Sequence, residues 1–474
     1  MIRQIPLLRN VDLFVRKGGP VELCETISQY HPTCRVSIFT TWPSEGKFTP
    51  ESIIQRAWLL SSMLYAVHVT CPEFPHSRNF IEHPDRVLQS MILLAPHIKE
   101  LALQRSRNGY KLSAWRFSEV VKVEGTTSEK PPAKLKTLSW PLDSEITAGQ
   151  FEDWQIITDF SLLESWTVGC IGDSALLQTI VDIHPFQRLT RLTLALFPPL
   201  GDHDSLEFWQ AADSMFQSLP SITYLALFGK FLSTFLANSV LPRHGSTLHE
   251  LKLHGYTQRG DQELQRLQTR GQIGPIFSTH DILQLADRCS SLQKLLICVQ
   301  RYRGLETDMW TALGRFPRLK ELNLLLNCLP QTDANRMPIP PRDLSDFEMS
   351  TLTFRPIDNI ECRRWFIRDC MINCAIGESL AKEFFTRIHA CQHEKSLMKL
   401  VIHPLIGQSN QYSCFSPGAT RAFIGTYFFN ELAFIWKVER DFMSVLHAES
   451  EKIPTSSISK DPFPDEKLEI LQSI

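Results

Sequence analysis

The chain has 474 residues, more than a single compact core usually holds, so either two or three domains or one elongated repeat array is expected. Hydrophobic residues make up 43% and charged residues 21%, as in ordinary folded proteins. The net charge of -2, without a dominant basic patch, argues against nucleic acid or an anionic membrane as the main partner.

The amino-terminal residues and the cysteines bear on the cellular compartment. Arg3, Arg9 and Asp12 interrupt any apolar run, so the start is not typical of a secretory signal peptide. No uninterrupted apolar window of about 18 residues predicts a transmembrane helix. The twelve cysteines follow no disulfide-framework spacing. We therefore expect reduced thiols in a cytoplasmic or nuclear protein that has no membrane partner.

One apolar frame recurs along the chain: apolar, two variable residues, apolar, one variable residue, apolar. At Leu319, Leu322 and Leu324 this frame is followed by Asn327, as in the strand signature of leucine-rich repeats. Residues two apart point to one face of an extended chain, so the second and third apolar side chains enter the core together. The frame begins at Leu8, Thr33, Leu64, Ile98, Leu135, Leu163, Leu189, Ile222, Leu248, Leu292, Leu319, Met349 and Leu397.

The amino-terminal end of the predicted array carries no polar cap. Residues 1–70 already contain three of the frames, and the first begins at Leu8. The ends of a repeat array need caps, because an open end exposes the apolar core to solvent. We therefore expect that a further segment belongs before Met1, or that the coding sequence starts upstream.

Helical periodicity occupies several segments between the frames. Pro96, Pro220 and Pro317 each stand two residues before the next frame, where proline ends one element and allows a strand to begin. Apolar residues spaced by three or four predict a helix in each of the intervening segments. These helices are predicted over residues 85–94, 174–183, 206–219, 280–289 and 305–316.

This alternation predicts an α/β fold, an irregular leucine-rich-repeat-like solenoid with parallel strands on its concave face, helices outside and a helical carboxy-terminal extension. The array is predicted over residues 1–329, followed by a proline-rich linker or loop over residues 330–343. The last repeats and the helical extension are predicted over residues 344–448, and a disordered tail over residues 449–474. The alternative is an ordinary α/β domain, because leucine is common and a doubly wound sheet also alternates strands with helices.

Two helical stretches are predicted within the extension. The first covers residues 356–390 and contains Gly377 near its middle, where glycine weakens a helix and a division into two helices is the alternative. The second is the apolar-rich stretch from Phe423 to His447.

No phosphate-binding loop, serine nucleophile elbow, zinc-protease motif or dinucleotide fingerprint is present in the sequence. The closest approach to a metal site is the group Cys370, Cys374, His389, Cys391 and His393. Zinc needs about four converging ligands, and the first two cysteines share one helical face. The alternative is that cysteines on an apolar helix fill the core, and the two halves lack a familiar zinc-site spacing. We therefore expect no catalytic residue, cofactor or metal. The less favoured alternative is an enzyme or a metal-binding protein with a site in the carboxy-terminal third.

The strand face opposite the buried leucines is the predicted protein-binding surface, because solenoids bind proteins on their concave face. Phe228, Leu296 and Leu325 are apolar at positions where solvent is expected, which indicates a contact patch. The alternative is that helices or the carboxy-terminal extension cover this face. The predicted binding residues are Phe39, Gln104, Phe228, Lys252, His254, Leu296, Asn323 and Leu325.

The repeats LPSITYLAL (Leu219 to Leu227) and FPRLKELNL (Phe316 to Leu324) resemble those of the F-box and leucine-rich-repeat-like proteins of filamentous fungi. In that family an amino-terminal F-box holds the adaptor of a cullin ubiquitin ligase, and the repeats recruit the substrate. This chain has no F-box motif near its amino terminus, so no adaptor-binding residue is carried over. The resemblance implies a non-enzymatic protein-interaction scaffold, in one form the substrate-recognition region of an F-box ubiquitin-ligase receptor without its F-box. A standalone repeat binding protein unrelated to ubiquitination is the alternative.

Overall fold

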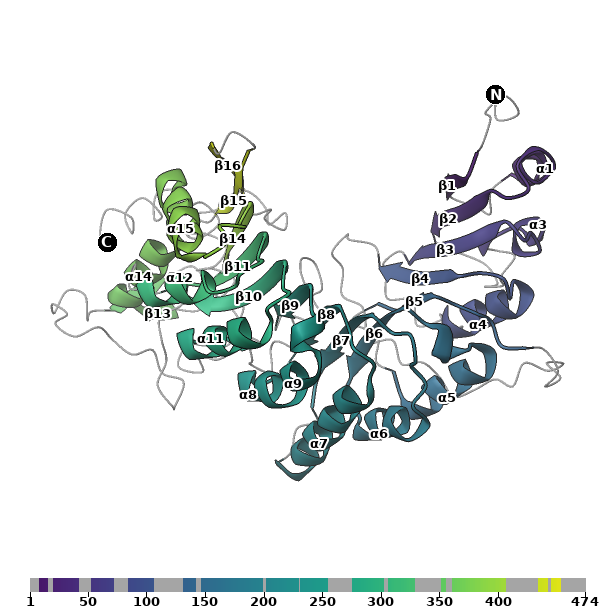
Figure 1. The fold of residues 1–474 in the computed structure, drawn as a ribbon, viewed down its shortest axis with the longest axis horizontal. Coiled ribbons are helices and arrows are strands. Elements are labelled where there is room, and N and C mark those ends of the chain that lie inside the picture. Colours follow the sequence, from purple (N-terminus) through teal and green to yellow (C-terminus); the bar gives the residue numbers. More distant parts are fainter. Residues whose placement is uncertain are drawn as a thin grey trace. The chain divides into compact units, whose positions relative to one another are not determined.

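The structure is a computed structural model, and the account below concerns the part of the chain that it describes (Figure 1). The described residues are 8–15, 20–41, 53–71, 84–105, 131–141, 146–198, 202–229, 231–254, 275–301, 306–328, 351–354, 360–405, 434–441 and 445–452.

One long, mostly parallel sheet of 14 strands dominates these residues, and it does not close on itself. The strands follow one another in chain order, apart from two that form a separate small sheet, and the last two run antiparallel. The strands are β1 (Asn10–Val15), β2 (Arg35–Thr41), β3 (Leu64–Cys71), β4 (Glu100–Arg105), β5 (Thr137–Ser139), β6 (Ser165–Ile171), β7 (Arg191–Leu196), β8 (Tyr224–Gly229), β9 (Glu250–His254), β10 (Lys294–Gln300), β11 (Glu321–Asn327), β14 (Lys399–Leu405), β15 (Phe434–Arg440) and β16 (Leu446–Lys452).

The chain divides into two compact units. Among the described residues, unit 1 holds those up to Leu227 and unit 2 holds those from Phe228 onward. Each unit has its own buried apolar core, and each is described by itself below.

In unit 1 the helices lie along one face of the sheet (Figure 1). The apolar residues of the strand frames are buried on that side, and an aromatic cluster including Trp154, Trp166 and Phe186 fills the core between β6 and the helices. The capping box of Thr147 and Gln150 starts α5, since each side chain bonds to the backbone of the other. The helical elements are α1 (Val21–Tyr30), α3 (Arg56–Leu59), α4 (Pro84–Leu94), α5 (Ala148–Ile157), η2 (Phe160–Leu162), α6 (Ser174–Ile183) and α7 (Asp202–Ser218).

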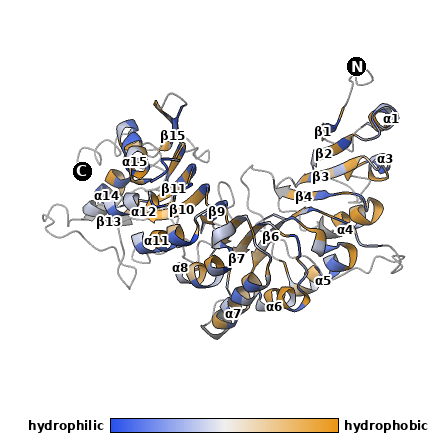
Figure 2. Ribbon diagram, in the orientation of Figure 1, coloured by the Kyte–Doolittle hydropathy of each residue, from blue (hydrophilic) through white to orange (hydrophobic). Residues whose placement is uncertain are grey.

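Unit 2 repeats this arrangement and adds a small antiparallel sheet of β12 (Thr351–Phe354) and β13 (Ile360–Arg363). Trp310 and Phe384 stack with ring centroids 4.4 Å apart and join α12 to α15. Hydrophobic and hydrophilic residues are mixed along the same elements, as expected where each has one buried side (Figure 2). The helical elements are α8 (Ser233–Phe235), η3 (Leu236–Val240), α9 (Leu241–His244), η4 (Gly245–Thr247), α11 (Thr279–Arg288), α12 (Thr307–Leu313), α14 (Arg364–Cys374) and α15 (Glu378–Cys391).

The entry to the parallel strands has a repeated hydrogen-bond pattern. The carbonyl of Lys99 accepts two consecutive N–H groups of the next strand entry, from Lys136 at 2.7 Å and Thr137 at 3.0 Å. A carbonyl oxygen can accept both because it has two lone pairs. The same double acceptance recurs at the carbonyls of Lys136, Glu164 and Thr190 in unit 1 and of His249, Gln293 and Lys320 in unit 2.

The predicted α/β fold is confirmed, and the apolar frame locates the strands. Every frame contributes to a strand, and the frames also align with one another in nearly every parallel pair whose register the structure describes, for example Leu322 opposite Leu295 and Leu400. In the β2–β3 pair an irregularity at Val36 and Ser37 shifts the register so that the frames do not align. In the β6–β7 pair Trp166 lies opposite Leu192, but a second irregularity between Thr167 and Cys170 shifts the register after that point. The frame at Met349 forms β12, which lies outside the large sheet, so its prediction as a further repeat is wrong.

The predicted helical extension needs correction at three places. Residues 360–363 form β13 rather than helix, while Gly377 does separate α14 from α15, as the alternative had it. The helix predicted from Phe423 to His447 is wrong over residues 434–440, which form β15, because its aromatic and β-branched residues pair with β14. β16 continues to Lys452, past the predicted start of the tail at residue 449. The predicted linker over residues 330–343 lies outside the described residues.

Among the described helices, none has the length and apolar content needed to cross a lipid bilayer.

The buried leucine ladder should carry much of the stability of unit 2. Leu322 is completely buried in β11, so Leu322→Ala should lower the free energy of unfolding by about 2–5 kcal/mol, the cost of lost burial and a cavity. Leu232 is 65% exposed in the same unit, and Leu232→Ala should change it by less than about 0.5 kcal/mol. Urea unfolding of both variants measures the difference, and equal losses would contradict the assignment of the core.

Candidate functional site

The eight predicted binding residues divide between the two units. Phe39 and Gln104 belong to unit 1, and the other six belong to unit 2. Gln104 lies in β4 opposite Thr70 of β3, and its side chain is outside the described part of the structure. The eight residues therefore do not make up one described site.

Three of the residues predicted in unit 2 are buried. Leu296 is 9% exposed and Leu325 is 2% exposed, and both belong to an apolar cluster with Cys298, against which Leu405 packs. His254 is also buried. The prediction that these side chains face solvent is therefore wrong, and their burial fits the alternative that this part of the strand face is covered.

The strand register brings three of the predicted residues into one row. Lys252, Leu296 and Asn323 lie opposite one another on β9, β10 and β11. The row holds one charged, one apolar and one amide side chain, and its central member is buried. It therefore offers no continuous apolar surface.

The ring of His254 lies near that of Phe228, with centroids 6.4 Å apart. Burial lowers the pKa of His254 to about 3, and the nearby His403 acts in the same direction. His254 is therefore uncharged at neutral pH and contributes no positive charge to the face.

Several charged side chains on the strands of unit 2 form pairs of opposite sign. Lys294 bonds to Glu321 at 2.9 Å, and Lys252 bonds to Glu250 at 2.9 Å. At the end of the sheet, Glu439 contacts Lys437 at 2.9 Å and Lys399 at 3.5 Å. Exposed pairs of this kind contribute little to stability, and they leave no strong field of either sign.

Unit 1 has a different surface, on which three rings stack across neighbouring strands. Phe14 of β1, Phe39 of β2 and His68 of β3 occupy paired positions. The centroids of the two phenylalanine rings are 4.7 Å apart at an angle of 15°, and those of Phe39 and His68 are 4.4 Å apart at 7°. Phe14 is 78% exposed. We call these three side chains the ring stack.

His68 closes the ring stack on its inner side. Its Nδ1 is buried and has no hydrogen-bond partner among the described residues. Burial lowers the pKa of His68, while the carboxylates of Glu100 and Asp12 act in the opposite direction with smaller effect. The imidazole is therefore held largely uncharged at neutral pH, which suits a ring packed against the face of Phe39.

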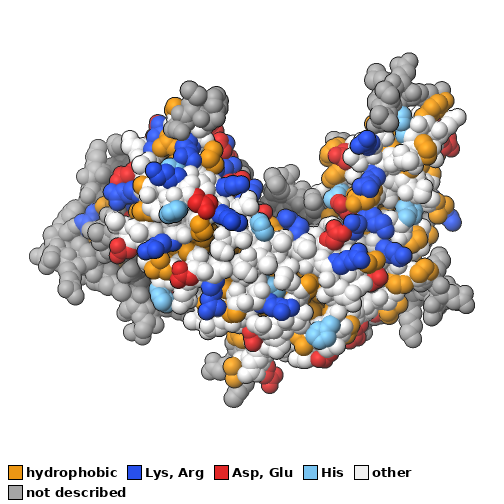
Figure 3. Space-filling view, in the orientation of Figure 1, with side chains coloured by type: hydrophobic (Ala, Val, Ile, Leu, Met, Phe, Trp, Pro, Cys, Tyr) orange, Lys and Arg blue, Asp and Glu red, His pale blue; other side chains and the backbone are white. Residues whose placement is uncertain are grey.

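A row of basic residues follows the amino-terminal ends of the strands in unit 1, and we call it the basic rim. Two carboxylates, Glu100 and Glu164, occupy the same row. Figure 3 shows Lys and Arg side chains gathered over the first strands of this unit. The members of the basic rim are Arg9, Arg35, Lys99, Lys134, Lys136, Arg188 and Arg191.

Three contacts order side chains within the basic rim. Lys136 bonds to Glu164 at 2.7 Å. The guanidinium carbons of two arginines lie over tyrosine rings, that of Arg35 at 5.0 Å from the ring of Tyr65 and that of Arg191 at 4.1 Å from the ring of Tyr224. Such contacts restrict each guanidinium while its in-plane N–H groups stay free to bind a planar anion.

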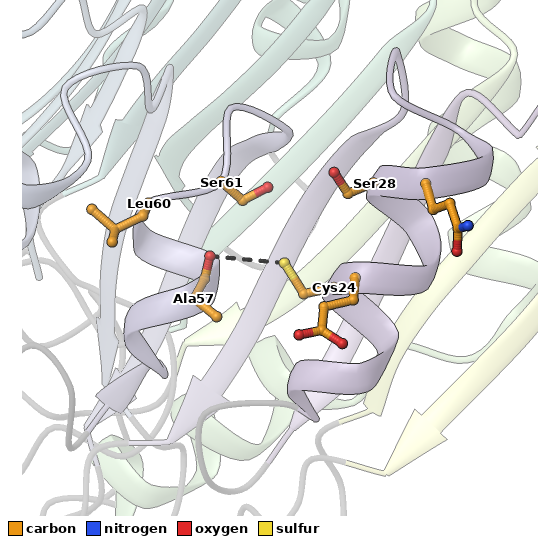
Figure 4. A pocket seen from close by; sticks show the side chains of 7 residues that line it. Cys24, Ser28, Ala57, Leu60 and Ser61 are labelled. Atoms are coloured by element: carbon orange, nitrogen blue, oxygen red, sulfur yellow. Dashed lines mark hydrogen bonds between the residues drawn. The ribbon is translucent and has the colours of Figure 1, made fainter.

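A shallow groove of about 420 Å³ lies on the helical side of unit 1, between α1 and α3 (Figure 4). The Cys24 thiol contacts the carbonyl of Ala57 at 3.8 Å. Burial raises the pKa of Cys24, so the thiol stays protonated and is a poor nucleophile. The groove therefore does not have the features of a catalytic site.

The five candidate metal ligands do not come together. Cys370 and Cys374 are buried beside Cys328, whereas Cys391 is exposed and its sulfur lies 4.0 Å from the hydroxyl of Thr311. His389 contacts Arg440 of β15, and His393 is exposed. Within the described residues no group of three or more His, Cys, Asp and Glu side chains is placed to hold a metal ion.

No protein-family model matches the sequence, and a search of curated proteins gives no significant match. The interpretation of these surfaces therefore rests on their own geometry and chemistry.

Sequence reasoning found one ring of the ring stack and missed the other two. Phe14 and Phe39 both follow directly after the third apolar residue of a frame, so aligning the frames would have placed Phe14 beside Phe39. His68 instead precedes the third apolar residue of its frame, and only the register shift between β2 and β3 brings it opposite Phe39. The basic rim was missed because its members lie far apart in the sequence.

The burial of His254 should make the stability of unit 2 depend on pH. The folded pKa of about 3 lies below the unfolded value of about 6.5, so the unfolded chain binds the proton first as pH falls. The stability that unit 2 owes to the uncharged His254 is fully present above about pH 6.5 and is lost progressively as the pH falls toward 3. At pH 5 the free energy of unfolding should be lower by about 2 kcal/mol. Urea unfolding near neutral pH and near pH 5 measures the loss.

The matched variants for this experiment are His254→Gln and His280→Gln, because His280 is exposed in the same unit. His254→Gln should lose about 2 kcal/mol less than the wild-type chain over the same pH interval, and His280→Gln should behave like the wild type. Parallel pH dependences in all three proteins would show that His254 is not the group responsible.

Proposed function

We propose that the chain is an irregular leucine-rich-repeat-like solenoid that works as a non-enzymatic protein-interaction scaffold. Three features support the solenoid architecture: the recurring apolar frame, the alternation of strands with helices on one face of the sheet, and the double acceptance of N–H groups at successive strand entries. In such arrays the strand face opposite the helices is the surface used for binding.

The ring stack is the observation that carries the proposal. A phenylalanine that is 78% exposed on a strand, backed by two further rings in parallel stacking, is a rigid apolar surface open to solvent. Aromatic side chains of this kind are enriched at the centres of protein interfaces, because they bury a large area while losing little side-chain entropy. We therefore place the partner on the strand face of unit 1.

The chemistry of the remaining titratable groups favours binding over catalysis. Burial raises the pKa of Cys289 and of Cys298 to about 12, and burial also raises that of Cys374. Thiols held protonated in this way are unsuited to nucleophilic attack. The nine cysteines whose side chains are described are all free thiols, which supports a reducing compartment, cytoplasmic or nuclear.

The narrower form of the proposal is substrate recognition for a cullin ubiquitin ligase. It rests on the resemblance of the repeats in Leu219 to Leu227 and Phe316 to Leu324. In this form the strand face recruits the substrate, and the ligase adaptor binds elsewhere. The broader form is a standalone repeat protein, and both use the same face of unit 1.

Photo-crosslinking from Phe14 tests the proposal. A benzoylphenylalanine placed at position 14 should form specific protein adducts in a native extract, and excess unlabelled chain should compete them away. Ile156 on α5 is 75% exposed on the helical side and is the matched control position. Adducts common to both positions, or none at position 14, would contradict the proposal. A ubiquitin-ligase adaptor or substrate among the adducts would support the narrower form.

Truncation of the exposed ring should then weaken the captured interaction. Phe14→Ala should reduce the binding free energy by about 2 kcal/mol, as expected for a central aromatic anchor. Ile156→Ala should change it by less than about 0.5 kcal/mol. Titration calorimetry with the purified partner gives both values, and equal effects of the two variants would place the interface elsewhere.

A further inference from the structure

We infer that the basic rim of unit 1 is a docking site for an acidic segment of a protein partner. The inference rests on the proposed function, since it names the chemistry of the partner that the strand face recruits. It is carried by the charge of the rim, by the contacts that order its side chains and by its place beside the ring stack.

The charge of the rim is concentrated and mostly positive. Seven basic residues and two carboxylates lie at the entries to β1–β7, although the whole chain has a net charge of -2. Among the residues that the structure describes, Lys136 alone of the seven has a carboxylate within ion-pair distance. The other six therefore present charge to solvent that this part of the chain does not neutralise.

Neighbouring lysines in the rim act on one another. The Lys99 ammonium donates to the carbonyl of Lys134 at 3.2 Å. The pKa of Lys99 is lowered mainly by burial and further by the positive charges of Lys134 and Lys136. This repulsion is relieved when an anion binds between the side chains, so an acidic ligand is favoured over a neutral one.

The structure already contains one example of the contact that a partner would make. Glu164 places a carboxylate oxygen 2.7 Å from the Lys136 ammonium while both side chains stay half exposed. Arg35 and Arg191 are oriented by the rings of Tyr65 and Tyr224, and each guanidinium can bind a carboxylate of the partner in the same way. The rim is therefore matched to carboxylates spaced along an extended polypeptide.

The spacing of the rim and the net charge of the chain favour a polypeptide over a nucleic acid. Neighbouring strands lie about 4.8 Å apart, and basic side chains stand at the entries of β1, β2, β4, β5 and β7, so carboxylates spread along an extended peptide can reach them in turn. Nucleic-acid-binding domains also usually carry a strong net positive charge, which this chain lacks.

The ring stack adds an apolar requirement to the partner. Arg35 of the rim and Phe39 of the ring stack lie four residues apart on β2, so both point to the same face of that strand. A segment bound to the rim can therefore place an apolar side chain on the ring stack. The partner that fits is an acidic segment with at least one aromatic or aliphatic residue.

A fluorescein-labelled polyglutamate peptide containing one phenylalanine is the probe, and fluorescence anisotropy with the full chain is the measurement. The peptide should bind, and binding should weaken as salt is raised because exposed charges are screened. Lys134→Glu/Arg188→Glu should bind at least about tenfold more weakly, since two attractions become repulsions. The matched control is Arg315→Glu/Arg318→Glu in unit 2, which makes the same change in net charge at exposed positions and should bind like the wild type.

Three outcomes would overturn the inference: no binding by the wild-type chain, equal weakening in both double variants, or tighter binding of polyuridylate RNA that is lost in the rim variant. The last result would assign the rim to nucleic acid. Unchanged circular dichroism and thermal midpoints identify the variants as folded. The protein adducts formed from position 14 test the interaction scaffold separately. If these adducts form but the wild-type chain does not bind the acidic peptide, the acidic partner is rejected and the proposed function is not.

Discussion

The hydrogen bonds at the strand entries fix the register on which the rest of the sheet depends. Each of these carbonyls, such as that of Gln293, accepts both N–H groups that open the next strand, from Lys320 at 2.8 Å and Glu321 at 3.0 Å. A slip of one residue would turn every side chain to the other face and expose the leucines. Hydrogen bonding and burial therefore select the same register, and the sequence on the opposite face is left free to vary.

This coupling explains why so much of the fold could be read from the sequence. The apolar frame records the buried face directly, and it predicts strands, faces and most of the pairing. It does not record where a strand pairs, which is why the frame at Met349 was misplaced: β12 pairs with β13 outside the large sheet. Nor does it separate strand from helix in an apolar stretch such as β15, where the free strand edge of β14 decides.

The candidate site was less predictable, because it depends on what neighbours each exposed position. The amide of Asn327 donates to the side chain of Gln300 at 2.8 Å, a residue that the register places opposite it on β10 and that the sequence pattern around Asn327 does not indicate. Leu296 and Leu325 were identified by their alternation, which gives the face of the strand and not the burial of that face. His68 joins the ring stack only through a register shift that no periodicity reveals.

The two units share one strand geometry but differ in the charges at the strand entries. In unit 2 one row of paired positions alternates in sign, from Glu250 through Lys294, Glu321 and Lys399 to Glu439 of the antiparallel strand β15, so neighbours neutralise one another across the sheet. In unit 1 the positions in the same register are mostly uncharged: Arg35 lies opposite Asn10, and Arg191 lies opposite Ser165. Neither arginine therefore meets a carboxylate across that strand pair, as Lys294 meets Glu321 in unit 2. Unit 2 neutralises its strand entries within the sheet, whereas unit 1 leaves these two positive charges available to a ligand of opposite charge.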